Sequence, residues 1–353
     1  MKKWLINAGL VCLFSSLCLS AMAATATFQT ISDPMTRTWA NYALSGDGTV
    51  MAANYGGEIY RWTAAGGFQD LGPGDPNSSS IGISRDGSTI ISGYIGSDGF
   101  SRPALWKASG RMDLGHPHNG CTKIGNSWGS GYGVSGNGSI AVGLAWTCTD
   151  AEGFEWTAKT GNISLGHPAG NHSSRASAIS ANGKTIVGFW EDPTGPRRPV
   201  RWVGGKHDLF LGTTTIGEAT AVNSDGTTIA GQAPGASGYG VAFFYSDKRG
   251  LIKLGTLTHI STDQSFANGI SDTGRVVGWS GDQFGHGIEA FTWISSSSSH
   301  MQKLASVLNK LGAKIPAGTT LTDAVSISAD GSTMAGQYVN GQTFGNWIAH
   351  ITK

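Results

Sequence analysis

The chain has 353 residues, of which 54 are glycine, 12 are tryptophan and only 13% are charged, with a formal net charge of +1. Glycine is about twice as frequent and charge about half as frequent as usual, while 39% hydrophobic residues can build a core, so a disordered chain and a helical bundle are both excluded. Nucleic acid is excluded as a partner, because phosphate binding needs clustered Lys and Arg. A turn-rich all-β protein remains.

The first 23 residues are typical of a cleaved export signal. Lys2 and Lys3 precede an apolar run, and Ala21-Met22-Ala23 carries the small residues that signal peptidase requires. Residues 24–353 are then the mature chain, which we expect to be periplasmic or extracellular. No later stretch approaches the roughly 20 apolar residues of a membrane span.

The segment after the signal, residues 26–31, is β-prone and has no local partner. The far end of the chain supplies one, because the last of the seven repeats described next stops at Ile351-Thr352-Lys353 without its fourth strand. We expect the two ends to pair and to close a ring of repeats.

Seven copies of one pattern occupy most of the chain: a small or apolar residue, Ser-x-Asp/Asn-Gly with some variation, and a mostly apolar run that ends in Gly. The average spacing of about 47 residues matches a four-stranded propeller blade. We expect strand a before the Ser-x-Asp-Gly turn, strand b after it, strand c with an aromatic residue between the blades, and a short strand d. The pattern predicts an all-β fold, a β-propeller of seven four-stranded blades forming a single domain over residues 24–353. The Ser position of the motif falls at Ser45, Ser84, Ser135, Ser180, Asn223, Ser271 and Ser328.

One segment breaks the β pattern. Met301, Leu304, Leu308 and Leu311 recur at helical spacing, and Gly312 suits a helix C-terminus. A short helix is therefore expected near residues 301–311.

Two cysteines remain after the signal is removed. Cys121 and Cys148 fall in loops of the third repeat that emerge on the same side, so they are predicted to form a disulfide that staples these loops. Histidines in neighbouring loops carry no accompanying metal-ligand motif, and no metal or cofactor is predicted. These histidines are His116, His118, His167 and His172.

The connections from strand b to c and from strand d to the next strand a should emerge together, on what we call the long-loop face; the Ser-x-Asp-Gly turns occupy the opposite, turn face. A ligand site is expected on the long-loop face because its loops are longer and more varied. Aromatic residues that follow strand b there could stack on a sugar, although aromatics at a repeated position are more often packing groups. The candidates are Tyr94, Trp146, Trp190 and Trp279.

Charged loop residues offer two further possibilities. Arg197 and Arg198 could grip an acidic ligand, or could pair locally with Glu191 and Asp192. Loop carboxylates could include an acid–base pair for glycoside cleavage, but no spacing selects two of them. They are Asp98, Asp150, Glu152, Glu191, Asp192, Asp282 and Glu289.

The sixth repeat resembles a known sequence family. It reads Leu-Gly-Thr-Leu at 254–257, Asn-Gly-Ile-Ser-Asp-Thr-Gly-Arg-Val-Val-Gly at 268–278 and Ala-Phe-Thr-Trp at 290–293. This is similar to the bacterial extracellular HAF repeat, although Glu289 stands where the family has its name-giving His. The resemblance implies export and a propeller-like β fold, and it implies no agreed activity.

Together these observations predict an exported, non-enzymatic β-propeller that binds a glycan, or an extracellular or envelope protein, through its long-loop face. One alternative is a propeller glycosidase or lyase that acts on extracellular polysaccharide. The other is a structural, envelope-associated repeat protein.

Overall fold

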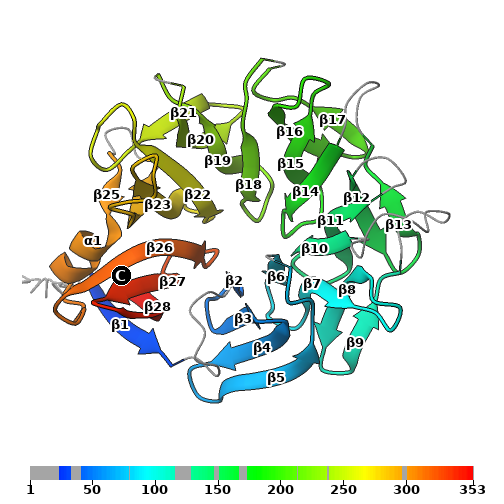
Figure 1. Cartoon of the computed structure of the whole chain (residues 1–353), viewed down its shortest axis with the longest axis horizontal. Helices are drawn as coiled ribbons and strands as arrows, with labels where there is room; N and C mark the ends of the chain where they lie inside the picture. Colours follow the sequence, from blue (N-terminus) through cyan, green and yellow to red (C-terminus); the bar gives the residue numbers. More distant parts are fainter. Residues whose placement is uncertain are drawn as a thin grey trace, which may run out of the picture.

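A computed structural model describes residues 24–32, 41–78, 80–115, 129–146, 151–166, 173–212, 214–236, 238–295 and 300–352. Over these ranges, 28 strands form seven antiparallel four-stranded sheets arranged as a ring (Figure 1). The predicted seven-bladed β-propeller is therefore confirmed. In each blade strand a lies innermost and strand d lies outermost. Residues at the ends of the seven innermost strands line a central cavity, which we call the channel.

The blades follow the chain in order. Blade 1 contains β2 (Asn41–Leu44), β3 (Val50–Tyr55), β4 (Glu58–Thr63) and β5 (Gly67–Pro73). Blade 2 contains β6 (Ile81–Ile83), β7 (Ile90–Ile95), β8 (Ser101–Lys107) and β9 (Gly110–Asp113). Blade 3 contains β10 (Gly129–Val134), β11 (Ile140–Trp146), β12 (Ala151–Thr157) and β13 (Gly161–Ser164). Blade 4 contains β14 (Ser173–Ile179), β15 (Thr185–Glu191), β16 (Arg197–Val203) and β17 (Lys206–Asp208).

The remaining blades keep the same order. Blade 5 contains β18 (Glu218–Val222), β19 (Thr228–Pro234), β20 (Gly240–Ser246) and β21 (Gly250–Gly255). Blade 6 contains β22 (Gln264–Ile270), β23 (Arg275–Gly281), β24 (Glu289–Ile294) and β25 (Gln302–Lys303). Blade 7 contains β26 (Thr319–Ile327), β27 (Thr333–Asn340), β28 (Thr343–Thr352) and, as its outer strand, β1 (Thr25–Ile31).

The two ends of the chain close the ring as predicted. β1 pairs antiparallel with β28 over its full length, from Thr25 opposite Thr352 to Ile31 opposite Asn346. The Ala26 amide also donates to the carbonyl of Leu311 at 2.8 Å. Blade 7 thus consists of the first strand and the last three strands of the chain.

The repeated Ser-x-Asp-Gly motif is a structural turn. In blade 1 the Ser45 hydroxyl donates to Asp47 Oδ1 at 2.6 Å and accepts from the Val50 amide at 3.0 Å, while the Thr49 amide donates to the same carboxylate at 3.0 Å. The hydrogen bonds from Ser45 and from the Thr49 backbone lower the pKa of Asp47. Gly48 has a φ of 71°, a left-handed conformation that favours glycine. The motif's polar groups therefore hold the a–b hairpin.

The glycine that ends the apolar run of strand b allows a close approach of strand a. A Cβ on Gly278 would lie 1.9 Å from the carbonyl oxygen of Phe266, and one on Gly336 would lie 1.9 Å from that of Asp323. Strand a carries a β-bulge beside each of these contacts, between Ala267 and Gly269 and between Ala324 and Ser326. Glycine is required there because any side chain would collide with the neighbouring backbone.

The strand c aromatics pack between blades, as expected. Trp347 is fully buried in a cluster that also contains Val277 of blade 6 and Leu304 and Leu308 of the helix. The helix α1 (Leu304–Lys310) is shorter than the predicted 301–311. Met301 precedes it and packs with blades 5 and 6, because residues 302–303 pair as strand d of blade 6.

The innermost strands are joined by a hydrogen-bonded ring at the turn face. Each blade is linked to the next through the one or two residues that follow the Ser position of its motif. The links are Gly46 N to Arg85 O (2.9 Å), Asp86 N to Gly136 O (3.4 Å), Gly136 N to Ala181 O (2.9 Å), Asn182 N to Ser224 O (3.1 Å), Ser224 N to Asp272 Oδ1 (2.8 Å), Asp272 N to Ala329 O (2.7 Å) and Ala329 N to Gly46 O (2.8 Å).

The Arg85 side chain reaches across the channel at this ring. Its guanidinium lies 3.0 Å from Asp272 Oδ2 of blade 6 and also donates to Ser224 of blade 5. A cavity of about 150 Å³ lies among the ring residues and the apolar side chains that end the innermost strands. The turn-face end of the channel is therefore narrow.

Candidate functional site

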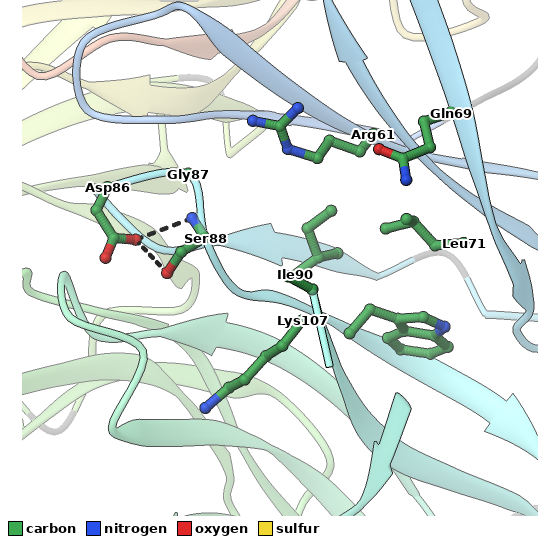
Figure 2. A pocket seen from close by; sticks show the side chains of 10 residues that line it. Arg61, Gln69, Leu71, Asp86, Gly87, Ser88, Ile90 and Lys107 are labelled. Atoms are coloured by element: carbon green, nitrogen blue, oxygen red, sulfur yellow. Dashed lines mark hydrogen bonds between the residues drawn. The ribbon is translucent and has the colours of Figure 1, made fainter. Parts of the chain in front are cut away.

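Two clefts lie between neighbouring blades on the turn face. The cleft between blades 1 and 2 has a volume of about 410 Å³, and Figure 2 shows Arg61 and Lys107 on either side of Ile90. The Asp86 carboxylate in this cleft binds the Ser88 amide at 2.9 Å and its hydroxyl at 2.7 Å (Figure 2). The Asp86 carboxylate is therefore occupied by hydrogen bonds within its own turn.

The corresponding cleft between blades 4 and 5 is larger, about 890 Å³. Its central cation, Arg201, contacts Asp208 at 2.8 Å and Asp247 at 2.9 Å. Arg201 and Asp208 both belong to blade 4, whereas the contact with Asp247 joins blades 4 and 5 on the turn face. These ion pairs are the kind of contact expected of blade packing.

A pocket of about 540 Å³ opens on the long-loop face between blades 6 and 7. Its walls come from the end of β23, the β23–β24 loop, the start of β26 and the β27–β28 hairpin. Its volume lies in the usual range for small-ligand sites. The lining residues are Trp279, Gly285, Gly287, Ile288, Thr320, Thr322, Asp323, Gln337, Tyr338, Val339, Phe344 and Gly345.

Aromatic rings form much of the wall. Trp279 is partly exposed and stacks on Phe266, with 6.3 Å between ring centroids and 6° between planes. Gly345 lies against the ring of Tyr338, since a Cβ there would be 2.8 Å from the ring atoms. Phe344 is 49% exposed. The pocket thus combines apolar surface with hydroxyl, amide and carboxyl groups.

Asp323 supplies the pocket's carboxyl group. Asn268 Nδ2 of blade 6 donates to Asp323 Oδ1 at 2.7 Å and to the carbonyl of Ala324 at 3.2 Å. Burial between the blades raises the pKa of Asp323 to about 7, against the lowering effect of its hydrogen bonds. Near pH 7 this carboxyl group therefore gains or loses a proton readily.

Sequence reasoning singled out Trp279 in this pocket and missed Asp323. The missed residue lies within a strand, whereas the carboxylates considered were those expected in loops. Three of these, Glu152, Glu191 and Glu289, in fact lie at or next to strand ends. One signal was present: the stretch Leu-Thr-Asp-Ala-Val at 321–325 places an acid inside an otherwise uncharged innermost strand.

Two of the candidate aromatics are packed between blades. Tyr94 is 5% exposed, its hydroxyl donates to Asp113, and Arg111 lies 4.1 Å above its ring. Trp190 is 2% exposed and meets Trp202 edge to face. These rings offer little surface to a ligand, as in the packing interpretation. Trp146, at the end of β11, is partly exposed.

Arg197 and Arg198 pair locally. Arg198 Nε donates to Asp192 Oδ2 at 2.9 Å, and Arg197 lies 3.4 Å from Glu191 and 3.0 Å from Glu218. Glu218 also binds Arg175 of the neighbouring innermost strand. The local-pairing interpretation therefore describes both arginines in this structure.

Most of the loop carboxylates also have partners. Asp98 binds Arg102, Glu289 lies 2.5 Å from Lys303, Glu152 accepts from Ser164, and Asp282 accepts from the amides of Phe284 and His286. Among the described residues, no group of three or more His, Cys, Asp or Glu side chains could hold a metal ion. Several predictions fall outside the described residues, namely the 1–23 signal, Asp150, the Cys121–Cys148 disulfide and the four loop histidines.

Comparison with known proteins identifies a fold and no family. No family model and no curated protein matches the chain. The β-propeller domain of the Trilobed protease from Pyrococcus furiosus, described as having an open velcro topology, is 11% identical with a TM-score of 0.56, covering 92% of this chain and 95% of that chain. A putative TolB from Agrobacterium tumefaciens is 14% identical (TM-score 0.47; 65% of this chain, 88% of that chain), and TolB from Acinetobacter baumannii is 11% identical (TM-score 0.46; 74% of this chain, 64% of that chain).

At such identities the likeness concerns the fold alone. The chain is a seven-bladed β-propeller, and its ring is closed by pairing of its two ends. In the part of the chain that the structure describes, no helix has the length and apolar character needed to cross a bilayer.

Proposed function

We propose that this protein is a non-enzymatic binding module that takes a glycan in the pocket between blades 6 and 7. The observation that carries the proposal is the partly exposed Trp279 in a pocket that also presents Asp323 and Gln337. Sugars offer apolar faces that stack on aromatic rings and hydroxyl groups that bond to carboxyl and amide groups. The lining matches both needs, on the face where the loops are longest.

A glycosidase would need a different set of carboxyl groups in this pocket. Glycoside cleavage generally uses two carboxyl groups about 5–10 Å apart. Within the described lining Asp323 is the one carboxyl group, which favours binding over cleavage. Incubation of any bound glycan with the protein, followed by chromatography of the products, tests this directly; shortened chains would overturn the non-enzymatic assignment.

A glycan array probed with the oxidised mature chain tests the binding proposal. We expect saturable binding that falls at least tenfold in Trp279→Ala and is retained in Trp146→Ala, a matched loss of a partly exposed tryptophan at the end of strand b in blade 3. Thermal unfolding of both variants controls for folding. No binding anywhere on the array would overturn the glycan assignment and favour an extracellular or envelope protein as the partner.

We also propose that the chain is exported and belongs with the HAF-repeat proteins. The basic and apolar leader and the sixth-repeat motif support this assignment. N-terminal sequencing of the protein recovered outside the cytoplasm should begin at Ala24. Recovery of uncleaved protein in the cytoplasm alone would contradict export.

A further inference from the structure

We infer that the glycan bound between blades 6 and 7 is an amino sugar, and that its ammonium group pairs with Asp323. This inference rests on the proposed function and specifies the class of its ligand. Three features of the site carry it: the pairing at equivalent positions of other blades, the groups around Asp323, and the aromatic wall.

The position of Asp323 can be compared with the equivalent position on the innermost strand of another blade, where a carboxylate forms ion pairs. Asp323 pairs with the residue after Gly336 on strand b, and Glu218 pairs with the residue after Gly231. Glu218 binds two arginines, Arg175 and Arg197. The corresponding position in blade 6, next to Asp323, is Phe266, which brings no charge.

The groups that face Asp323 are neutral in the described part of the chain. β22 contributes Asn268, β27 contributes Gln337 and Tyr338, and β23 contributes Trp279. The nearby loop carries His286, which is 79% exposed and lies 3.1 Å from Asp282. No Lys, Arg or His among the described residues forms an ion pair with Asp323, so a ligand cation would supply the missing charge.

The aromatic wall favours the same kind of ligand. A cation close to the face of a Trp or Tyr ring is attracted by the ring quadrupole, and the attraction grows when water is excluded. Trp279 and Tyr338 line the pocket that contains Asp323. An amino sugar presents an apolar ring face and an ammonium group together, and so matches both features.

Proton competition gives a second signature. Because the pKa of Asp323 is about 7 in the free protein, protonation competes with the ligand's ammonium group below that pH. Affinity for the amine should then fall by up to about tenfold per pH unit between pH 7 and 5. Among the described residues near the pocket, the Asp282–His286 pair is another titratable group, and a His286→Gln variant should keep this dependence.

The test compares three oligosaccharides of equal length by isothermal titration calorimetry at pH 7.5: a glucosamine oligomer with free amines, its N-acetylated form, and an uncharged glucose oligomer. The free-amine oligomer should bind at least tenfold more tightly than the other two. Asp323→Asn should abolish that preference, since an amide oxygen can still accept from Asn268 but carries no charge. Asp208→Asn, a matched charge loss on the turn face, should preserve it.

Each other outcome has a distinct meaning. Equal binding of the three oligomers, unchanged in Asp323→Asn, overturns the amino-sugar inference and leaves the glycan site standing. Failure of all three and of the array overturns the proposed function itself. Binding of an Nα-acetyl-lysine amide as tightly as glucosamine overturns the sugar assignment and places the amine on a protein.

Discussion

The channel wall of blades 4 and 5 and that of blades 6 and 7 use the same position in opposite ways. In the first, Arg175 and Glu218 face each other across neighbouring innermost strands, and Arg197 adds a second cation. In the second, the same positions hold Phe266 and Asp323. The repeated fold thus provides equivalent positions in each blade. In blades 4 and 5 the charged side chains at these positions form ion pairs with one another. In blades 6 and 7 the carboxyl group has no charged partner among the described residues and can bind a ligand.

Both channel walls exist only in the closed ring, so opening the ring should cause the largest loss of stability. Deletion of residues 24–33 removes β1 and leaves β28 and the buried Trp347 without their outer cover. We expect a loss of more than about 4 kcal/mol in unfolding free energy, seen in urea denaturation as destabilisation of the whole ring. An unchanged main transition, with fraying confined to one blade, would contradict this.

Loss of the Glu218 carboxylate from the channel wall of blades 4 and 5 should destabilise the fold more than loss of the Asp323 carboxyl group from the wall of blades 6 and 7. Glu218→Gln leaves Arg175 and Arg197 without their shared carboxylate, whose side chain is 12% exposed. Destabilisation of about 2–3 kcal/mol is expected in urea denaturation at pH 7. Glu191→Gln, which loses a single 3.4 Å contact with Arg197, is the control and should cost much less; equal losses would refute the special role of Glu218.

Loss of the Asp323 carboxyl group from the channel wall of blades 6 and 7 should have the opposite effect on stability. The pKa of Asp323 is raised in the folded chain to about 7 from a usual value of 3.8. Between these values the folded state holds a proton that the unfolded state has released, so this residue's contribution to stability is full below pH 3.8 and is lost as the pH rises to 7, by up to about 1.4 kcal/mol per unit. Asp323→Asn should remove that slope and be the more stable protein at pH 8.

Urea denaturation from pH 4 to pH 8 measures this slope. Asp208→Asn, on the turn face, should keep the wild-type dependence. A destabilised Asp323→Asn at pH 8 would show that the carboxylate is already neutralised by a partner within the protein.

The ion pair at the turn-face rim should matter least. Arg85 and Asp272 are both substantially exposed, and exposed pairs contribute about 0.2–1 kcal/mol. Arg85→Ala should cost no more than that, because the bond from the Gly46 amide to the Arg85 carbonyl is unaffected. A loss as large as that of Glu218→Gln would mean that side chains, rather than the backbone ring, join the blades there.

Much of the fold could be predicted because its determinants are local and repeated. The Ser45 hydroxyl and the Asp47 carboxylate bind within their own turn, so the motif alone predicts the hairpin. The bonds that join these turns into a ring were not foreseen, because they connect residues far apart in sequence. The strand-b glycine repeats for an equally simple reason, since strand a crosses close to it.

The site was harder to predict because it depends on what is missing from a neighbouring strand. Nothing near Asp323 in sequence shows that the adjacent position is Phe266, more than fifty residues earlier. Likewise, Arg197 and Arg198 are compatible with a ligand or with local pairing until Glu218 and Asp192 are placed beside them. Trp279 was identified because its position within the repeat is visible in sequence.

The pairing of β1 with β28 also sets the order in which this molecule can be made. β1 precedes all the other strands of the ring in the chain, and its partner β28 follows them. The first strand therefore stays without its partner until β28 has been synthesised, and a nascent chain that lacks β28 cannot close its ring. Closure of the ring consequently follows the synthesis of its last strand and depends on the β-sheet pairing of longest range in sequence.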